Sequence, residues 1–297
     1  MPASYTGKKL CAFLRGEAQI SYALTATLRH TPGAVTRDGD PIRSIDRVCE
    51  GDRIRVTFPE EQTKLQAAPI PIEILYEDAD MLVLNKSGYL AMHPSHGHQT
   101  DTLANGVTQY LADNGKDGVF HAVGRLDKGT SGVVLCALHT YAASRMAAQT
   151  EKTYIALVDA ELHGSGTVDA PIVRPDPDKT LRAVGADGEA AVTHYEVLCS
   201  GGGKSLVWLR PETGRTHQIR VHMAHIGAPL TGDSLYGMPV PELSRHLLHC
   251  AAVRVRHPVT NAELLFSAPL PPEFLRQIEA AMPEEIEKIQ KKSGMFA

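Results

Sequence analysis

An aspartate between two basic residues lies at the centre of the segment GRLDKGTSG, residues 124–132. Arg125 and Lys128 flank Asp127 closely, and a nearby positive charge favours the ionised form of a carboxylate. An ionised carboxylate on a rigid loop can act as a nucleophile, a general base or a metal ligand. Spacing alone leaves open a simpler interpretation, in which Asp127 only makes local backbone hydrogen bonds in a turn between strands.

Two hydrophobic segments must position this loop. VFHAV, residues 119–123, alternates like a strand, and GVVLCAL, residues 132–138, has the continuous apolar character of a buried strand. Gly129 and Gly132 allow backbone turns that other residues resist. The pattern therefore predicts a tight loop that holds Asp127 between two strands.

Several blocks of the chain, in consistent order, resemble the RluA family of RNA pseudouridine synthases. HAVGRLDKGTSG is similar to the family signature HRLDxxTSG, and the other similar blocks are YEDADMLVLNKSG, EKTYIALV, ETGRTHQIRVHMAHIGAPLTGDSLYG and LLHCAAVRVRHPVT. The resemblance covers about residues 70–275, and ordered separate blocks make it specific. Two positions depart from the family pattern, since Gly124 replaces the usual histidine and Ser87 the usual proline.

The resemblance implies an isomerase that detaches uracil from ribose, rotates it and rejoins it through carbon 5, with no cofactor. It assigns Asp127 as the nucleophile, and attack on the uracil ring or on the ribose carbon both remain open. It places Arg220 beside Asp127, where the planar guanidinium would hold the carboxylate through two bonds. Tyr154 corresponds to the tyrosine that stacks on the flipped uracil and accepts the C5 proton. Without the resemblance, the local sequence would favour interpreting Tyr154 as a core tyrosine and Arg220 as an exposed strand residue.

The same resemblance implies a set of substrate-binding residues. Arg125 would fill the space that the extruded base leaves, because flipping a base costs a few kcal/mol of stacking. The expected apolar wall of the base pocket is Leu248, and the expected phosphate and ribose contacts are Arg215, His217, His222 and His225. At position 124 we expect glycine to give the loop freedom, and a histidine introduced there to be tolerated.

Two other classes of function are weighed against this one. The spacing of His217, His222 and His225 invites a metal site, but no Cys or acidic residue stands at ligand spacing to them. The three histidines of the polar loop 93–101 also invite one, but the pattern shows no carboxylates to support such ligands from behind, so we expect no metal. A non-catalytic RNA-binding relative, such as an RNA chaperone, would not need Asp127, Tyr154 and Arg220 together.

Composition is that of an ordinary globular protein, with 43% hydrophobic and 22% charged residues among 297. The five cysteines are widely spaced without a CxxC pair, which argues against a disulfide framework and favours a reducing cytoplasm. No apolar run suggests a signal peptide or a membrane span. The net charge is −4, yet residues 1–66 hold ten basic against eight acidic residues, and residues 204–257 hold seven against three. We interpret these regions as an RNA-facing side.

The pattern of elements predicts an α+β protein. Residues 1–66 are expected to form a small α+β domain, with helical character over 8–32 and then two short strand-like runs. This domain resembles the αL-type RNA-binding domain, although a small domain without that role is nearly as well supported. Residues 67–280 are expected to form the catalytic domain, a mixed and largely antiparallel sheet with a central cleft. Residues 281–297 are expected to form a helical tail, and the protein to be a monomer that binds ribosomal or transfer RNA.

Within the catalytic domain we expect helices over residues 103–115, 140–150 and 271–282, and a further one over 283–292. Strands are expected within 72–86 and over 154–160, 191–199, 205–211, 246–256 and 262–268. The segment after residue 211 is expected to lead into the next strands without a helix.

Overall fold

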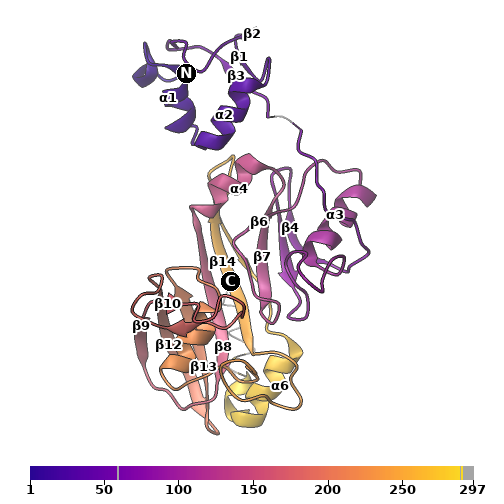
Figure 1. The fold of residues 1–297 in the computed structure, drawn as a ribbon, viewed down its shortest axis with the longest axis vertical. Helices are drawn as coiled ribbons and strands as arrows, with labels where there is room; N and C mark the ends of the chain where they lie inside the picture. The colour runs from indigo at the N-terminus through magenta and orange to yellow at the C-terminus, as the bar shows by residue number, and fades with distance from the viewer. Residues whose placement is uncertain (59, 288, 290–297) are drawn as a thin grey trace.

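A long mixed β-sheet forms the body of the molecule in the computed structural model, which describes residues 1–58, 60–287 and 289 (Figure 1). The strand order is β4-β5-β7-β14-β8-β13-β12-β9, with β15 also paired to β14 and β6 to β7. The strands are β4 (Glu73–Glu77), β5 (Met81–Lys86), β6 (His121–Val123), β7 (Ser131–Ala137), β8 (Thr150–Val158), β9 (Ser165–Asp169), β12 (Val192–Gly201), β13 (Lys204–Pro211), β14 (Leu248–Arg256) and β15 (Glu263–Ser267).

Within the described part of this sheet, β7 and β14 run parallel and the other strand pairs are antiparallel. The predicted α+β class with a mixed, largely antiparallel sheet is therefore confirmed. Parallel strands begin at the same edge of a sheet, so the loop before β7 meets the first residue of β14. Gly132 makes this approach possible, because its φ is +109° and a Cβ there would collide with the carbonyl oxygen of Cys250.

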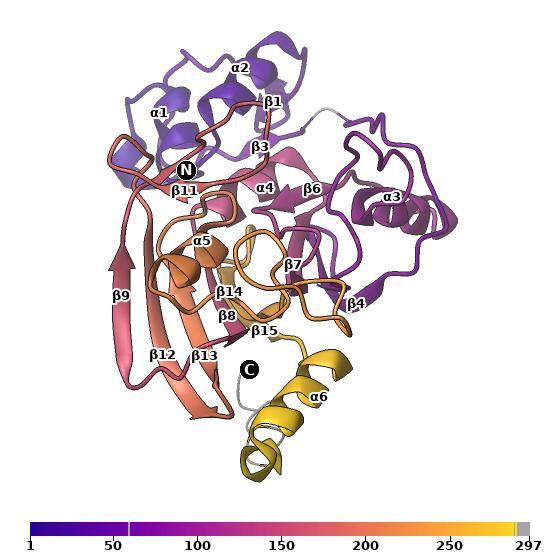
Figure 2. The ribbon, with the colours of Figure 1, turned by 60° about the horizontal axis from the view of Figure 1, so that its bottom comes forward.

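Helices cover the sheet and complete its core (Figure 2). The predicted helices α3 (Leu103–Asp113), α4 (Thr140–Ala147) and α6 (Pro272–Ala281) are all present. Thr102 and Asn105 form a capping box that starts α3. β7 is buried along its whole length, whereas Phe274 and Ile278 of α6 pack in a second apolar cluster with residues of β8 and β13. The loop that carries Asp127 is therefore attached to one of the best buried strands.

A helix that the sequence did not predict follows β13. Residues of α5 (Gln218–His225) were expected to be irregular or extended, and this expectation was wrong. Six consecutive residues, 218–223, are buried, so the helix shows no apolar stripe of period 3.6. It also lacks a side-chain cap, and it starts after His217, whose φ of 59° is left-handed. The sequence therefore offered neither an apolar stripe nor a capping side chain to mark the start of this helix.

The first 58 residues build a separate apolar cluster around two helices and a three-stranded sheet. The expected helical region 8–32 is divided into α1 (Leu10–Arg15) and α2 (Tyr22–His30), which follow a 3-10 turn, η1 (Ala3–Tyr5). The small sheet has the order β2-β1-β3, with β1 (Val35–Arg37), β2 (Asp40–Pro41) and β3 (Ile54–Val56). Asp38 and Gly39, both with positive φ, form the turn between β1 and β2.

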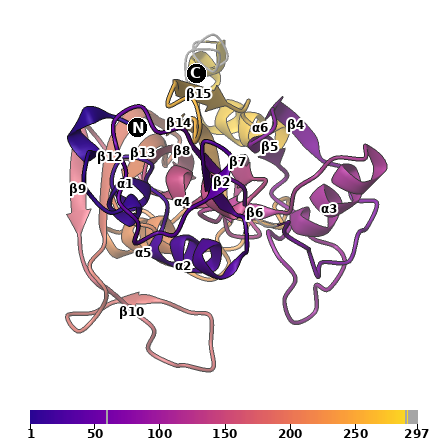
Figure 3. The ribbon, with the colours of Figure 1, turned by 90° about the horizontal axis from the view of Figure 1, so that it is seen from above.

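This N-terminal region contacts the body of the protein near α4 (Figures 1 and 3). The ring of Phe58 stacks on that of Tyr141, with centroids 5.2 Å apart. Glu61, in the connecting segment, accepts a hydrogen bond from the backbone of Thr140 at 2.7 Å and lies 2.6 Å from Nε2 of His121. The connection is therefore held against the sheet by specific contacts.

Two peripheral segments complete the chain. β10 (Ile172–Val173) and β11 (Ala183–Val184) pair at the base of a loop that projects from the body (Figure 3). After α6 a short 3-10 turn, η2 (Pro283–Glu285), is followed by helical residues 286, 287 and 289, whereas residues 288 and 290–292 of the predicted helix lie outside the described residues. Among the described helices, none has the length and apolar character needed to cross a bilayer.

Candidate active site

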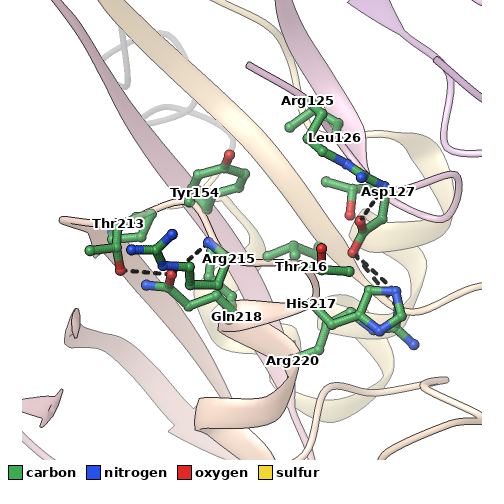
Figure 4. Close-up of a pocket in the computed structure, with 15 residues that line it drawn as sticks. Arg125, Leu126, Asp127, Tyr154, Thr213, Arg215, Thr216, His217, Gln218 and Arg220 are labelled. Carbon is green, nitrogen blue, oxygen red and sulfur yellow. Dashed lines mark hydrogen bonds and ion pairs between the residues drawn. The ribbon is translucent and has the colours of Figure 1, made fainter. Parts of the chain in front are cut away.

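One pocket brings together seven of the nine residues that the sequence singled out for catalysis and substrate binding, and His222 and His225 do not line it (Figure 4). It lies where the loop before β7, the strand β8, the start of β14 and the segment leading into α5 converge. Its lining includes Asp127, Tyr154, Arg220, Arg125, Leu248, Arg215 and His217. These residues are separated by up to 123 positions in the chain, so the sheet topology is what gathers them.

The carboxylate of Asp127 is surrounded by basic side chains at distances longer than a hydrogen bond. Its oxygens lie 3.8 Å from Nη1 of Arg220, 3.9 Å from Nε2 of His217 and 4.0 Å from Nη2 of Arg125. The side chain is 16% exposed. Within the described residues no side-chain hydrogen bond occupies these oxygens, so their lone pairs remain available.

Arg220 is held by a different carboxylate from the one expected. Its Nε and Nη2 each donate a hydrogen bond of 2.7 Å to Asp233, whereas only Nη1 faces Asp127. The expectation that Arg220 grips Asp127 through two bonds was therefore wrong. Burial works against the charge of both partners, but their mutual hydrogen bonds outweigh it: the pKa of Asp233 is lowered and that of Arg220 raised. The Arg220 guanidinium therefore keeps its positive charge at a fixed place beside Asp127.

Tyr236 completes the support beneath the pocket. The Arg220 guanidinium lies over its ring, 4.9 Å from the centroid, and its hydroxyl is 2.8 Å from Nδ1 of His217. Burial lowers the pKa of His217, so this imidazole is mainly neutral at neutral pH. Sequence reasoning missed both Asp233 and Tyr236. Their signal was an acidic and an aromatic residue in GDSLYG, at the end of the same block that contains Arg220.

Tyr154 lies across the pocket from Asp127 (Figure 4). It is 8% exposed and sits in the middle of β8, paired with Cys250 of β14 and Leu209 of β13. Burial, followed by the nearby Cys250 and Asp127, raises the pKa of Tyr154 well above its usual value. The phenol is therefore neutral, with its ring available as a stacking surface. Leu248, 4% exposed, provides apolar lining as expected.

A glutamine braces the segment that carries Arg215 and His217. Oε1 of Gln218 accepts hydrogen bonds from the hydroxyl of Thr213 at 2.8 Å and the backbone of Arg215 at 3.0 Å. Nε2 of the same residue donates to the carbonyl of Val192 at 2.9 Å. The Arg215 side chain turns towards Glu189, 2.5 Å away, and is 41% exposed. It is thus at the pocket rim, where a polyanion could compete for it.

The loop of Asp127 is anchored from behind by a buried lysine. Nζ of Lys86 donates to the carbonyl oxygens of Ser87 and Leu90 at 2.8 Å each and of Lys128 at 3.3 Å. Lys86 is 1% exposed. On the other side, the hydroxyl of Thr130 is 3.0 Å from Nε2 of His246. Sequence reasoning missed Lys86, although it lies within a block that carries the family resemblance.

Comparison with known proteins agrees with this geometry. Residues 80–225 match the family model described as RNA pseudouridylate synthase. The uncharacterized RNA pseudouridine synthase YjbO of Bacillus subtilis is 40% identical over 89% of this chain and 96% of its own length. The chain belongs to the RluA family of RNA pseudouridine synthases. Its enzymatic class is therefore isomerase, and RNA is its substrate.

Other relatives extend the comparison to a named substrate and to solved structures. Ribosomal large subunit pseudouridine synthase D of Haemophilus influenzae is 34% identical, over 82% of this chain and 81% of the relative. The solved structure of human RNA pseudouridylate synthase domain containing 1 has a TM-score of 0.56 and 26% identity. It covers 70% of this chain and 87% of the human one. The fold and the family are thus supported independently.

One expectation about this RluA-family pocket was wrong, and the backbone geometry argues against a second. His222 is fully buried and hydrogen bonds to the hydroxyl of Thr193 and the carbonyl of Ala170, both at 2.9 Å, so it contacts no RNA. Gly124 has a φ of +72°, and a Cβ there would lie 2.8 Å from Nζ of Lys152. A histidine at this position would be strained and would displace Lys152, so tolerance is not expected.

The histidines of the synthase do not assemble a metal site near the pocket. His217 and His222 bond to different partners, and His225 is exposed outside the pocket. Elsewhere in the described residues, Asp78, Asp80 and His257 cluster closely enough to hold an ion. Nδ1 of His257, however, accepts hydrogen bonds from two backbone N–H groups, which leaves the proton on Nε2, where it bonds to Asp78 at 2.8 Å. This tautomer offers no lone pair to a metal.

Proposed function

We propose that this isomerase converts specific uridines of ribosomal or transfer RNA into pseudouridine, with Asp127 as the nucleophile. The observation that carries the proposal is the position of Asp127, whose carboxylate faces three basic side chains within 4.0 Å and is hydrogen-bonded to none of them. The relative named for the ribosomal large subunit supports ribosomal RNA as the first substrate to test. Such a substrate would place the protein in the cytoplasm.

The fixed charge of Arg220 has a defined part in this mechanism. Attack on the ring and attack on the ribose carbon both begin with the carboxylate of Asp127, which the Arg220 guanidinium faces at 3.8 Å without occupying its oxygens. In the overall isomerisation the N1–C1′ bond breaks and a C5–C1′ bond forms. C5 loses a proton and N1 gains one, so atoms balance without a further reactant.

Arg125 is suited to replacing the extruded base. Its side chain is 64% exposed and its guanidinium stands at the mouth of the pocket, 4.0 Å from Asp127. A planar guanidinium can stack where a base has left, which offsets part of the few kcal/mol lost on flipping.

Tyr154 is proposed to stack on the flipped uracil. The raised pKa keeps its phenol protonated, so it can accept the C5 proton only by passing on its own. Replacing Tyr154 by phenylalanine keeps the ring, so RNA affinity is expected to stay within a few-fold. Single-turnover modification should slow by about 10²-fold or more if the hydroxyl relays the proton.

A leucine at the same position is the matched control, because it removes the ring as well as the hydroxyl. Tyr154→Leu should weaken RNA binding in addition to slowing the reaction. Unchanged single-turnover rates in Tyr154→Phe would leave stacking as the only role of Tyr154 and assign proton removal to another group.

The experiment that tests the substrate is a map of pseudouridines in ribosomal and transfer RNA from cells with and without this protein. Sites that vanish in its absence, and that the purified enzyme restores on RNA from the deficient cells, are its targets. A map without differences, together with no activity on that RNA, would contradict the proposed substrates.

We further propose that residues 1–66 form an RNA-binding unit. Arg53 and Arg55 are exposed and line a groove beside β3 with Thr36 and Thr57. Replacing both arginines by glutamine should weaken RNA binding and flatten the slope of log affinity against log salt by about 1.4, for two lost phosphate contacts. Removing residues 1–66 should flatten it at least as much, while modification at saturating RNA survives.

The matched control is Arg43→Gln. Arg43 is equally exposed, but its guanidinium is held by Asp46 at 2.9 Å, so its loss should leave the salt slope unchanged. An unaltered slope after removal of residues 1–66 would instead reduce this region to a structural role.

A further inference from the structure

A second groove opens directly beside the catalytic pocket. It is lined by the loop that follows β6, the first half of β8 and the segment after β13. Arg125, Tyr154, Thr213 and Gly214 line both cavities, so the two form one continuous surface. The mechanism above assigns no role to the residues that only the groove contains, which include Gly124, Lys152 and Arg210.

Lys152 is the least exposed cation of this groove. Its ammonium donates one long hydrogen bond, 3.4 Å, to the carbonyl of Val123, although it carries three hydrogens. No carboxylate among the described residues comes within ion-pairing distance of it. Burial lowers the pKa of Lys152, which reflects a cation without a counter-ion. The hydrogen bond to Val123 uses only one of the three donors of Lys152, which lies two residues before Tyr154.

Gly124 provides the space that Lys152 occupies. With a φ of +72°, a Cβ added at this position would lie 2.8 Å from Nζ of Lys152, so any side chain would push the ammonium away. Gly124 is itself exposed at the groove. The backbone at this point therefore leaves the ammonium accessible from the groove.

The charge of the groove favours an anion. Arg125, Lys152 and Arg210 contribute three positive charges, against the carboxylates of two glutamates. Both carboxylates have other partners, since Glu151 lies 4.0 Å from Arg254 and Glu212 lies 2.6 Å from His194. Arg125 lies 4.0 Å from Asp127, whereas Lys152 and Arg210 have no carboxylate within ion-pairing distance among the described residues, so these two cations remain free to bind a ligand that approaches along the groove.

We propose that this groove binds the RNA backbone next to the uridine in the catalytic pocket, with Lys152 contacting a phosphate of a flanking nucleotide. The proposal rests on the proposed function, because it takes the reacting uridine to lie beside Asp127. A compact ammonium suits a single phosphate, and the strand that leaves the pocket must follow a surface continuous with it. Lys152 is accordingly a substrate-binding residue.

The first test measures RNA affinity as a function of salt for the full-length chain and for Lys152→Gln, with a single-stranded uridine homopolymer as the probe. Loss of one phosphate contact should reduce the slope of log affinity against log salt by about 0.7. Lys179→Gln is the control, because Lys179 is 71% exposed and paired with Asp176 at 3.1 Å. It should leave the slope unchanged.

The second measurement is the single-turnover rate on ribosomal and transfer RNA from cells lacking the protein. Lys152→Gln should need more RNA to reach its maximal rate, while the maximal rate stays within about threefold, which is under 1 kcal/mol of transition-state stabilisation. A lowered maximal rate with an unchanged salt slope would overturn the proposal, because Lys152 would then act on Tyr154 and not on RNA.

A double-mutant cycle with Gly124→Ala separates two effects of this substitution: the loss of room for the Lys152 ammonium, and the backbone strain of a non-glycine residue at position 124. The backbone strain of Gly124→Ala is the same with Lys152 or Lys152→Gln present, so it cancels in the cycle. The substitution should flatten the salt slope when Lys152 is present and leave it unchanged when Lys152 is already replaced. Equal changes in both backgrounds would contradict the coupling. Failure of the proposed function would differ, since the wild type itself would then form no pseudouridine.

Discussion

Replacing Asp127 by asparagine is expected to abolish pseudouridine formation while RNA affinity stays within a few-fold of the wild type. Asparagine keeps the shape of the side chain but has neither the charge nor the nucleophilic oxygen. Because no hydrogen bond from the described residues holds the Asp127 carboxylate, the substitution should disturb the pocket little. We expect a rate loss on the order of 10⁴-fold or more, as for other removed nucleophiles.

The measurement is the single-turnover yield of pseudouridine at saturating RNA, with affinity determined separately. Asp187→Asn is the matched control, since Asp187 is exposed and lies outside the pocket, and it should leave the rate unchanged. An Asp127→Asn enzyme that keeps a tenth of the wild-type rate would move the reaction to another residue. A variant that lost RNA binding as well would indicate that Asp127 has a structural role.

The sequence predicted those parts of the site whose signals are local. The strands around the loop of Asp127 and the strand of Tyr154 follow from apolar runs and turn residues, and the structure contains them. The family was identified from several similar sequence blocks in a consistent order, and not from the physical properties of the residues. With it came the expectation that Asp127, Tyr154 and Arg220 meet, and they do line one pocket.

What the sequence did not predict depends on contacts made after the chain has folded. The helix α5 is buried along six consecutive residues, so its period is hidden, and Arg220 therefore seemed a strand residue. Spacing alone could not show that Arg220 bonds to Asp233 and not to Asp127. The difference matters because it leaves the oxygens of Asp127 without a hydrogen bond from Arg220. The conflict between a side chain at 124 and Lys152 is equally invisible until both backbones are placed.

Breaking the Arg220–Asp233 pair is expected to have the largest effect on stability. Both side chains are almost inaccessible, with exposures of 9% and 0%, and Asp233 also accepts hydrogen bonds from the backbone of Leu235 and Tyr236. Asp233→Leu would leave the guanidinium buried without its partner, which should lower the free energy of unfolding by about 3–5 kcal/mol. Urea unfolding followed by fluorescence or circular dichroism measures this change.

The same pair predicts a dependence of stability on pH. The pKa of Asp233 in the fold is below its usual value, because Arg220 stabilises the carboxylate more than burial destabilises it. The contribution of the pair is therefore complete above the usual aspartate pKa and is lost as the pH falls through the lower folded value. The urea midpoint of the wild type should decline in that acidic range more steeply than that of a variant without the pair.

The double variant Arg220→Met with Asp233→Leu separates folding from catalysis. Replacing a buried ion pair by apolar side chains of similar size is often neutral or stabilising, so the double variant should recover much of the stability lost in Asp233→Leu. It should nevertheless form no pseudouridine, because the charge 3.8 Å from Asp127 is gone. Recovery of activity together with stability would show that the pair serves only the fold. A stable but inactive double variant would assign to Arg220 the electrostatic role beside Asp127, with Asp233 as the residue that directs its charge there.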